Sequence, residues 1–184
     1  MRRKPQTDEL LYEYCPTCKS DLQFKTFEDR QVLGCTQCSF LFWNNPRPVV
    51  SALIIQNNNV LLIKRKSEVY NGYWSLPGGI INYLEEPEEA LSREISEETG
   101  IQVVKGRLID AYLIVYAPNG LGKSPSHTSI DLIYSCHIKG VITCLKHRYS
   151  NSEVEDVGVF PINQLPKLIA FKHREIINKH SSLL

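Results

Sequence analysis

The sequence predicts an α/β protein in which a mixed sheet lies between helices and a small β module precedes the main domain. Two observations lead to this prediction. Strand and helix patterns intermingle along most of the chain, and two Cys-x-x-Cys pairs are confined to its first part. The 184 residues have room for one full domain plus a module, and 42% of them are hydrophobic, which is enough for a core. We divide the chain into residues 1–43, a tail with the cysteine module, and residues 44–184, the main domain.

The cysteine module is predicted to bind zinc. Cys15 and Cys18 form one pair, Cys35 and Cys38 form the other, and sixteen residues separate the two pairs. This is the spacing of a zinc ribbon, in which four thiolates surround one tetrahedral Zn²⁺ and the metal supplies folding energy that so short a segment lacks. A thioredoxin-like redox motif would leave the second pair unexplained. Residues 22–33, between the pairs, are predicted to form a β-hairpin.

Charge and hydropathy narrow the choice of partners. The net charge is +1, and residues 1–43 carry six basic and six acidic residues, with the only basic cluster, residues 2–4, outside the ribbon. A ribbon that stabilises the fold or borders the substrate site is therefore favoured over a ribbon that binds nucleic acid. No stretch approaches the ~20 apolar residues of a membrane span, and no apolar run follows the basic N-terminus as in a secretory signal. We expect a cytoplasmic protein with no membrane partner and no nucleic-acid partner.

The main domain begins with a predicted hairpin. After a linker at 44–48, the β-branched apolar run 49–55 predicts a buried strand, and residues 60–65 predict the returning strand. The asparagines at 57–59 form the turn between them.

Three residues near this hairpin are candidate substrate contacts. Arg47 in the linker and Arg65, beside Lys64 at the end of the returning strand, are candidates for phosphate contact, although a solvated strand end is the favoured alternative for Lys64 and Arg65. Trp74 could stack on a base, although packing in the core is the favoured alternative for it.

A helix is predicted between Pro87 and Gly100. Proline suits the first turn of a helix, and glycine suits the left-handed position just past its end. Leu91 and Ile95 form an apolar seam that faces the core, and Pro77-Gly78-Gly79 ahead of the helix permits a tight turn close to a ligand.

The predicted helix and the residues just before it are unusually acidic. Residues 85–98 hold seven of the chain's 20 acidic residues and one base, Arg93. Glu94, Glu97 and Glu98 share one face of the helix. Like charges at such spacings cost roughly 0.2–0.5 kcal/mol per pair, so a bound cation is indicated, and oxygen ligands favour Mg²⁺ or Mn²⁺. A solvated acidic helix, the alternative, would explain neither Arg93 nor the glycines.

The rest of the chain alternates strands and loops before a last helix. The long loop at 117–127, which includes His127, is rich in turn residues, and such loops are often functional. The remaining predictions are strands at 103–104 and 108–116 with a break at Gly106, a strand at 128–138, an acidic loop at 151–156, a short strand at 157–160 and a helix around 171–179.

The segment from Gly79 to Ile101 resembles the Nudix box. Gly79, five residues, Glu85, seven residues and then Arg-Glu-Ile-Ser-Glu-Glu-Thr-Gly-Ile agree with every specified position of that motif. The resemblance implies an α/β/α sandwich and a pyrophosphatase that cleaves nucleoside diphosphates linked to another moiety, with Mg²⁺ or Mn²⁺.

The resemblance also implies residue roles. Glu94, Glu97 and Glu98 would bind the metal together with the carbonyl of Gly79, and these glutamates belong to the catalytic set. Arg93 would orient the acidic cluster by bidentate pairing, and Glu85 would act in the same network. For the general base, Glu94 in the box and Glu153 or Glu155 in the later acidic loop stay open.

The substrate is less defined by the sequence. A zinc ribbon ahead of a Nudix domain resembles the NADH pyrophosphatase arrangement, but the Ser-Gln-Pro-Trp-Pro type array of that family is absent from residues 109–123. The ending at 160–166 and 169–171 is similar to zinc-ribbon relatives associated with ADP-ribose or FAD. A small dinucleotide or nucleotide-sugar diphosphate is therefore favoured, and a homodimer is the family expectation. The alternatives are a nucleotide-binding sensor module without turnover and an RNA 5′-end pyrophosphohydrolase.

Overall fold

The computed structural model describes residues 12–67, 69–115, 128–142 and 152–181, and it divides into two compact units, Met1–Asn45 and Pro46–Leu184. The loop at 117–127, with His127, therefore lies outside the described residues. No helix in the described ranges has the length and apolar character that crossing a bilayer requires.

The first unit is a three-stranded antiparallel sheet in the order β1 (Leu22–Phe27), β2 (Arg30–Cys35), β3 (Leu41–Phe42). Glu28 and Asp29 connect β1 to β2 with φ of 45° and 60°, the backbone of a two-residue hairpin turn. The predicted hairpin is confirmed. Its small core consists of Cys15, Leu22, Leu33 and Cys35, with Cys38, Phe40 and Phe42 packed against them.

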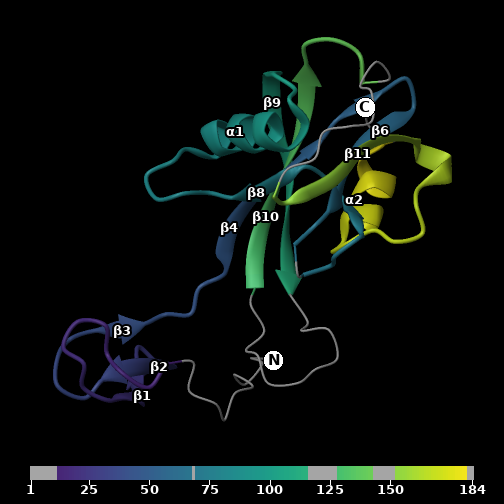
Figure 1. Cartoon of the computed structure of the whole chain (residues 1–184). Helices are drawn as coiled ribbons and strands as arrows, with labels where there is room; N and C mark the ends of the chain where they lie inside the picture. Colours follow the sequence, from purple (N-terminus) through teal and green to yellow (C-terminus); the bar gives the residue numbers. More distant parts are fainter. Residues whose placement is uncertain (1–11, 68, 116–127, 143–151, 182–184) are drawn as a thin grey trace. The chain divides into compact units, whose positions relative to one another are not determined.

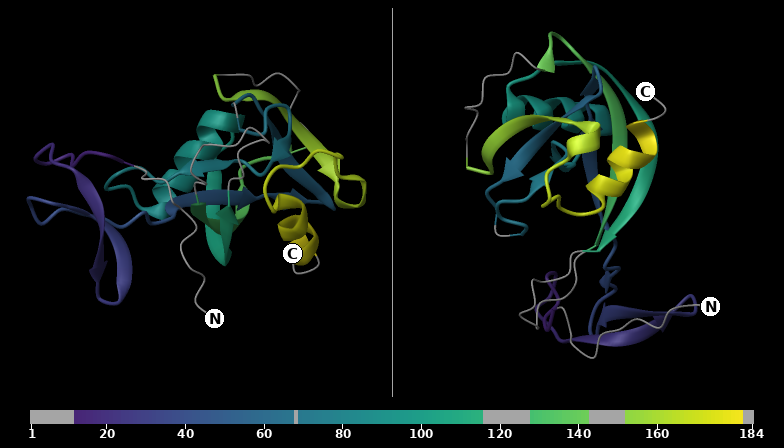
Figure 2. Two further views of the ribbon diagram at one scale, coloured as in Figure 1. Left: turned by 90° about the horizontal axis from the view of Figure 1, so that it is seen from below. Right: turned by 90° about the vertical axis from the view of Figure 1, so that its right-hand side faces the viewer.

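The second unit contains two sheets (Figures 1 and 2). The first has the order β8 (Gly78–Ile80), β4 (Arg47–Leu53), β10 (Thr128–Ile138), β9 (Val103–Val115), in which only the β4–β10 pair is parallel. The second has the order β11 (Val154–Pro161), β6 (Asn59–Arg65), β5 (Ile55–Gln56), and β7 (Trp74–Ser75) also pairs with β6.

Each long helix covers its own hydrophobic cluster. Helix α1 (Pro87–Thr99) buries Leu91 and Ile95 against Val50 and Tyr134 of the first sheet. Helix α2 (His173–His180), which a 3₁₀ turn (η2, Ile162–Gln164) precedes, buries Ile176 and Ile177 in a second cluster with strand residues of both sheets. The strands therefore lie between two helices, and the predicted α/β fold with a mixed sheet is confirmed.

Gly106 does not break a strand, contrary to the prediction, because β9 runs through it in register with Cys136. A Cβ atom at this position would lie 2.8 Å from Leu91 Cδ2 of α1, so the glycine allows the helix to approach the sheet.

Two other boundaries differ from the prediction. Strand β4 already begins at Arg47, inside the predicted linker, because it pairs with β10 there. Strand β11 begins at Val154 rather than 157, because Val154 is buried and pairs with Arg65. Pairing with a neighbouring strand thus overrides the local sequence pattern at both places.

Candidate active site

A cavity of about 710 Å³ lies in the second unit, a size typical of small-molecule sites. Its walls come from β4, β6, β8, α1 and β10 and from residues at the start of α2. Segments far apart in the sequence thus meet around one space.

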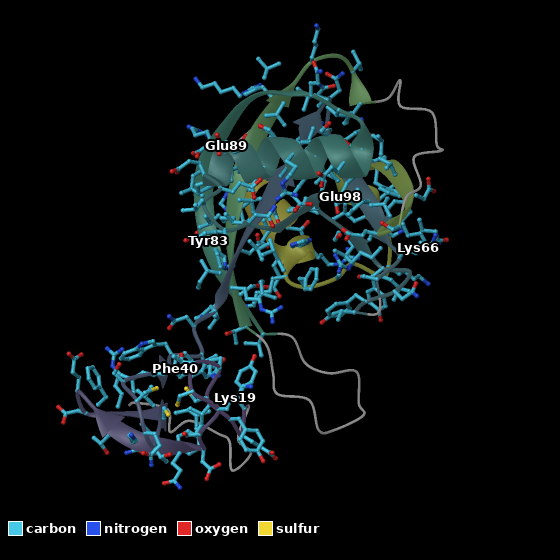
Figure 3. All side chains as sticks on the ribbon, turned by 60° about the vertical axis from the view of Figure 1, so that its left-hand side comes forward. Lys19, Phe40, Lys66, Tyr83, Glu89 and Glu98 are labelled. Atoms are coloured by element: carbon cyan, nitrogen blue, oxygen red, sulfur yellow. The ribbon has the colours of Figure 1, made fainter. Side chains whose placement is uncertain are left out.

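The end of the cavity nearest α1 is acidic. Glu94 and Glu98 line it and are buried, while Glu97 lines it with a side chain that is 58% exposed. The helix that presents them has proline in its first turn, and Gly100 ends it with φ of 71° and an N–H that donates to Ser96. Figure 3 labels Glu98 on the side of α1 that faces the strands.

Burial changes the acidity of two of these carboxyls. Desolvation raises the pKa of Glu98 to about 8, although the Gly78 N–H donates to its carboxylate at 2.7 Å and opposes the shift. Desolvation also raises the pKa of Glu94 against the lowering effect of Arg93. Buried carboxyls that resist ionisation in the metal-free protein are suited to a cation, which would favour their charged form.

Arg93 connects the carboxylates. Its Nε and Nη2 donate to the two oxygens of Glu85 at 2.7 and 2.9 Å, and Nη1 donates to Glu94 at 2.7 Å and to Glu97 at 3.2 Å. These hydrogen bonds lower the pKa of Glu85 to about 2. Nη2 also donates to the Ile80 carbonyl at 3.2 Å, which ties α1 to strand β8.

Two glycines of β8 allow these close approaches. A Cβ atom on Gly78 would lie 2.0 Å from the Val50 carbonyl oxygen, and one on Gly79 would lie 2.4 Å from a Glu94 carboxylate oxygen. The first contact is with the backbone, and the second is with the end of a side chain. Gly78 is therefore required by the sheet and Gly79 by the acidic end of the cavity.

The family model of the NUDIX domain matches residues 45–180, which include every residue of this cavity. The chain belongs to the Nudix family.

A protein of Methanocaldococcus jannaschii named ADP-ribose pyrophosphatase is 31% identical over 136 residues, 74% of this chain and 73% of that protein. NAD-capped RNA hydrolase NudC of Pseudomonas aeruginosa is 25% identical over 158 residues, 85% of this chain but only 50% of that protein. The crystal structure of a MutT NUDIX hydrolase from Burkholderia pseudomallei has a TM-score of 0.59 and 28% identity, and the match covers 73% of this chain and 97% of that one. The predictions of a Nudix fold and of a Nudix pyrophosphatase are confirmed.

The Nudix cavity also contains other predicted residues. Arg47, Arg65 and Glu153 line it, and Glu85 is connected to it through Arg93. Glu155 belongs instead to β11 and forms an ion pair with Lys64 at 2.7 Å, and neither side chain lines the cavity. Among the candidates for the base outside the box, the structure thus brings Glu153 to the site and not Glu155.

The suggested role of Trp74 in base stacking needs correction. Its ring packs edge-on against Phe160 with centroids 4.7 Å apart, belongs to the α2 cluster and does not line the Nudix cavity. The alternative of core packing describes its place, because β7 pairs with β6 and turns the side chain into that cluster.

Sequence reasoning missed one polar pair in the Nudix cavity. Asp131 of β10 and His173 of α2 are each 3% exposed, line the cavity and contact one another at 3.2 Å. The two residues are 42 positions apart and belong to no motif. The signal that could have found Asp131 is a carboxylate inside an otherwise apolar strand.

The four cysteines form a separate candidate metal site in the first unit. Their sulfur atoms lie within 4.8 Å of one another, with separations of 3.7 Å for Cys15–Cys38, 3.4 Å for Cys18–Cys35 and 3.6 Å for Cys18–Cys38. A tetrahedron with Zn–S bonds of about 2.3 Å has sulfur atoms about 3.8 Å apart, so the set can surround one metal ion. Among the residues that the structure describes, no other group of His, Cys, Asp or Glu side chains is gathered so tightly, the Nudix glutamates included.

Proposed function

We propose that this protein hydrolyses the diphosphate bond of a nucleoside diphosphate linked to another moiety, with a divalent cation held by Glu94, Glu97 and Glu98. The observation that carries the proposal is the acidic end of the cavity, which all three glutamates line. Arg93 links Glu94 to Glu97, Glu94 lies against Gly79, and Glu98 accepts the Gly78 N–H. Oxygen donors alone are the ligand set of Mg²⁺ or Mn²⁺.

The cation, when bound, neutralises charge on the diphosphate and favours ionisation of water. The protein's own residues position the reaction. Arg93 keeps the carboxylates in one network, and Gly79 leaves room for Glu94 beside the strand. Glu94 and Glu153 both line the cavity and are the candidates for the base that accepts the water proton.

Two arginines in the same cavity suit the phosphates. Arg47 and Arg65 line the cavity together with the glutamates, and the charge of Arg65 opposes the rise of the Glu98 pKa that burial causes. A site with carboxylates and guanidinium groups around one space matches a metal-bound diphosphate, whose oxygens are neutralised from both sides.

We favour ADP-ribose, FAD or a similar dinucleotide as the substrate. The relative from Methanocaldococcus jannaschii, named ADP-ribose pyrophosphatase, supports this class, as does a cavity volume of about 710 Å³, which is larger than a diphosphate alone requires. An RNA 5′ end is the second candidate, supported by the similarity to a NAD-capped RNA hydrolase over 85% of this chain.

We also propose that the four cysteines hold a structural Zn²⁺. The sulfur separations fit a tetrahedral site, and a core this small needs a metal to fold.

The test is a turnover panel with Mg²⁺ and Mn²⁺ over ADP-ribose, FAD, NADH, nucleoside triphosphates and NAD-capped RNA, with Glu98→Gln as the metal-site variant. We expect metal-dependent release of a nucleoside monophosphate from a small dinucleotide, lost in the variant. Cleavage of the capped RNA alone would favour the second candidate, and nucleotide binding without cleavage of any substrate would identify a sensor module.

A further inference from the structure

The Asp131–His173 pair has a defined hydrogen-bond direction. The backbone N–H of Leu76 donates to His173 Nδ1 at 2.9 Å, so Nδ1 carries no proton. The remaining ring proton is then on Nε2, which donates to Asp131 Oδ2 at 3.2 Å. Both ring nitrogens of His173 are therefore hydrogen-bonded, and the ring fixes the orientation of the Asp131 carboxylate.

The other oxygen of this carboxylate lacks a partner. Asp131 Oδ1 is buried and makes no hydrogen bond to any residue that the structure describes, although Asp131 lines the cavity. A buried acceptor without a donor is unfavourable, and at the wall of a cavity a bound ligand can supply the donor. The carboxylate thus indicates a ligand group with an N–H or O–H bond.

Strand β4 sets the distance between this acceptor and the acidic end. Val49 of β4 lies opposite Asp131 of β10 on one side and opposite Ile80 of β8 on the other. Asp131 is therefore two strand spacings from β8, about 10 Å. A ligand that has its diphosphate at Gly79 and a donor at Asp131 must extend across this width, as a ribose with a purine does and a bare diphosphate does not.

The surroundings of Asp131 favour a base over a sugar. Leu76, Ile114 and Phe171 contribute apolar cavity wall, and the Phe171 ring lies 5.2 Å from the His173 ring. These apolar side chains beside the Asp131 acceptor match a flat ring that bears an amino group, and the Arg65 guanidinium, 5.0 Å from the centre of the Phe171 ring, borders the same space. Because Oδ1 is buried, we expect the surrounding cavity wall to adjust when the base enters.

We propose that Asp131 determines base specificity by accepting a hydrogen bond from the exocyclic amine of a 6-aminopurine. The proposal rests on the proposed function for the position of the diphosphate. It adds the group that is recognised at the other end of the cavity.

The test is an exchange of acceptor for donor. In Asp131→Asn, the amide oxygen can keep the bond from His173 and the amide N–H₂ then replaces Oδ1. With Mg²⁺, kcat/KM is measured for ADP-ribose, its hypoxanthine and unsubstituted-purine counterparts, and its 2′-deoxy form. We expect the wild type to prefer ADP-ribose to the purine counterpart at least tenfold, and Asp131→Asn to lose that preference and to favour hypoxanthine, whose C6 oxygen accepts.

Asp110→Asn is the matched control. Asp110 of β9 also contacts a histidine of α2, His180 at 3.2 Å, but it does not line the cavity. The control is expected to keep the wild-type base preference. Thermal melting of both variants confirms that each is folded.

Binding of AMP and of purine riboside monophosphate, measured by calorimetry without metal, separates the two proposals. If Asp131→Asn changed the preference between the two nucleotides but the wild type showed no turnover, the proposed function would be wrong. Asp131 would still be the residue that recognises the base. Turnover by the wild type with an unchanged base preference in Asp131→Asn, or a preference that follows the 2′-hydroxyl, would overturn the present inference.

Discussion

At the residue scale, Arg93 is the centre of the acidic end of the cavity. One guanidinium group contacts three carboxylates and a backbone carbonyl, which only a planar fork of donors can do. The network therefore depends on the shape of the side chain as well as its charge.

Arg93→Lys tests that dependence. Lysine keeps the positive charge but cannot pair with both oxygens of Glu85 while it reaches Glu94. We expect at least a tenfold loss of kcat and a loss of about 1–2 kcal/mol in the free energy of unfolding. Steady-state kinetics and urea unfolding are the measurements, with Lys64→Arg, at an ion pair outside the cavity, as the control. Unchanged turnover would show that the charge of Arg93 is sufficient.

Glu98→Gln tests whether Glu98 is needed for turnover but not for folding. Glutamine still accepts the Gly78 N–H but offers no charge to a cation, so the fold is retained and metal-dependent turnover falls by about 100-fold or more. Circular dichroism and turnover at limiting Mg²⁺ check the two parts. Near wild-type turnover at limiting Mg²⁺ would contradict the metal-binding role.

The pKa of Glu98 gives a pH dependence to stability. Because the folded pKa of about 8 lies above the ordinary value of 4.5, the folded metal-free protein binds a proton that the unfolded chain has released between these values. Stability must therefore fall as pH rises from about 4.5 to 8, by at least about 1 kcal/mol. Urea unfolding in Mg²⁺-free buffer at pH 5.5 and 8 measures it.

Two variants of α1 check the origin of this effect. Glu98→Gln should flatten the decrease, whereas Glu97→Gln, at a largely exposed side chain on the same helix face, should leave it in place. An equal slope in all three proteins would assign the pH dependence to other groups.

At the element scale, strand β8 connects the first sheet to helix α1. Gly78, the first glycine of β8, has no room for a side chain. Gly78 has φ of 148°, and an added Cβ would overlap the backbone of Val50. We expect Gly78→Ala to reduce the free energy of unfolding by about 3 kcal/mol or more.

Gly140→Ala is the matched control, since Gly140 has φ of 100° but nothing within 4 Å of an added Cβ. Only backbone strain of about 1 kcal/mol is expected there. Chemical unfolding of both variants measures the difference. Equal losses would show that the contact with β4 is unimportant.

The elements that the sequence predicts best are those with local signals. Proline, acidic residues and glycine mark α1 from residues 85–100 alone, and two Cys-x-x-Cys pairs mark the first unit. The elements predicted less well depend on distant strands: Arg47 joins β4 because β10 pairs with it, and Val154 joins β11 because β6 does. The same limit applies to the site, since Asp131 and His173 meet only after β10 and α2 pack together.

At the scale of the whole molecule, the two units have separate cores. The first unit's cluster consists of its own leucines, aromatic residues and cysteines, and both clusters of the second unit lie beyond residue 49. We therefore expect the two units to respond separately to loss of the metal at the cysteines.

Cys35→Ser tests this expectation. Zinc content should fall from one ion per chain to none, and the amide NMR signals of residues 12–45 should collapse to unfolded positions while those of the main unit persist. Cys136→Ser, at a buried cysteine of the main unit, should keep the zinc and lower the stability of that unit instead. Loss of the main unit's signals in Cys35→Ser would show that it needs the ribbon to fold.

The absence of a side chain at Gly106 has a consequence far from the ligand. Leu91 of α1 fits into the space that this glycine leaves on β9, so any larger residue there must displace the buried Leu91 side chain or the helix that carries it. The glutamates belong to that rigid helix and would move with it. A substitution at this one position, which does not itself line the cavity, is therefore expected to weaken cation binding through a displacement of α1.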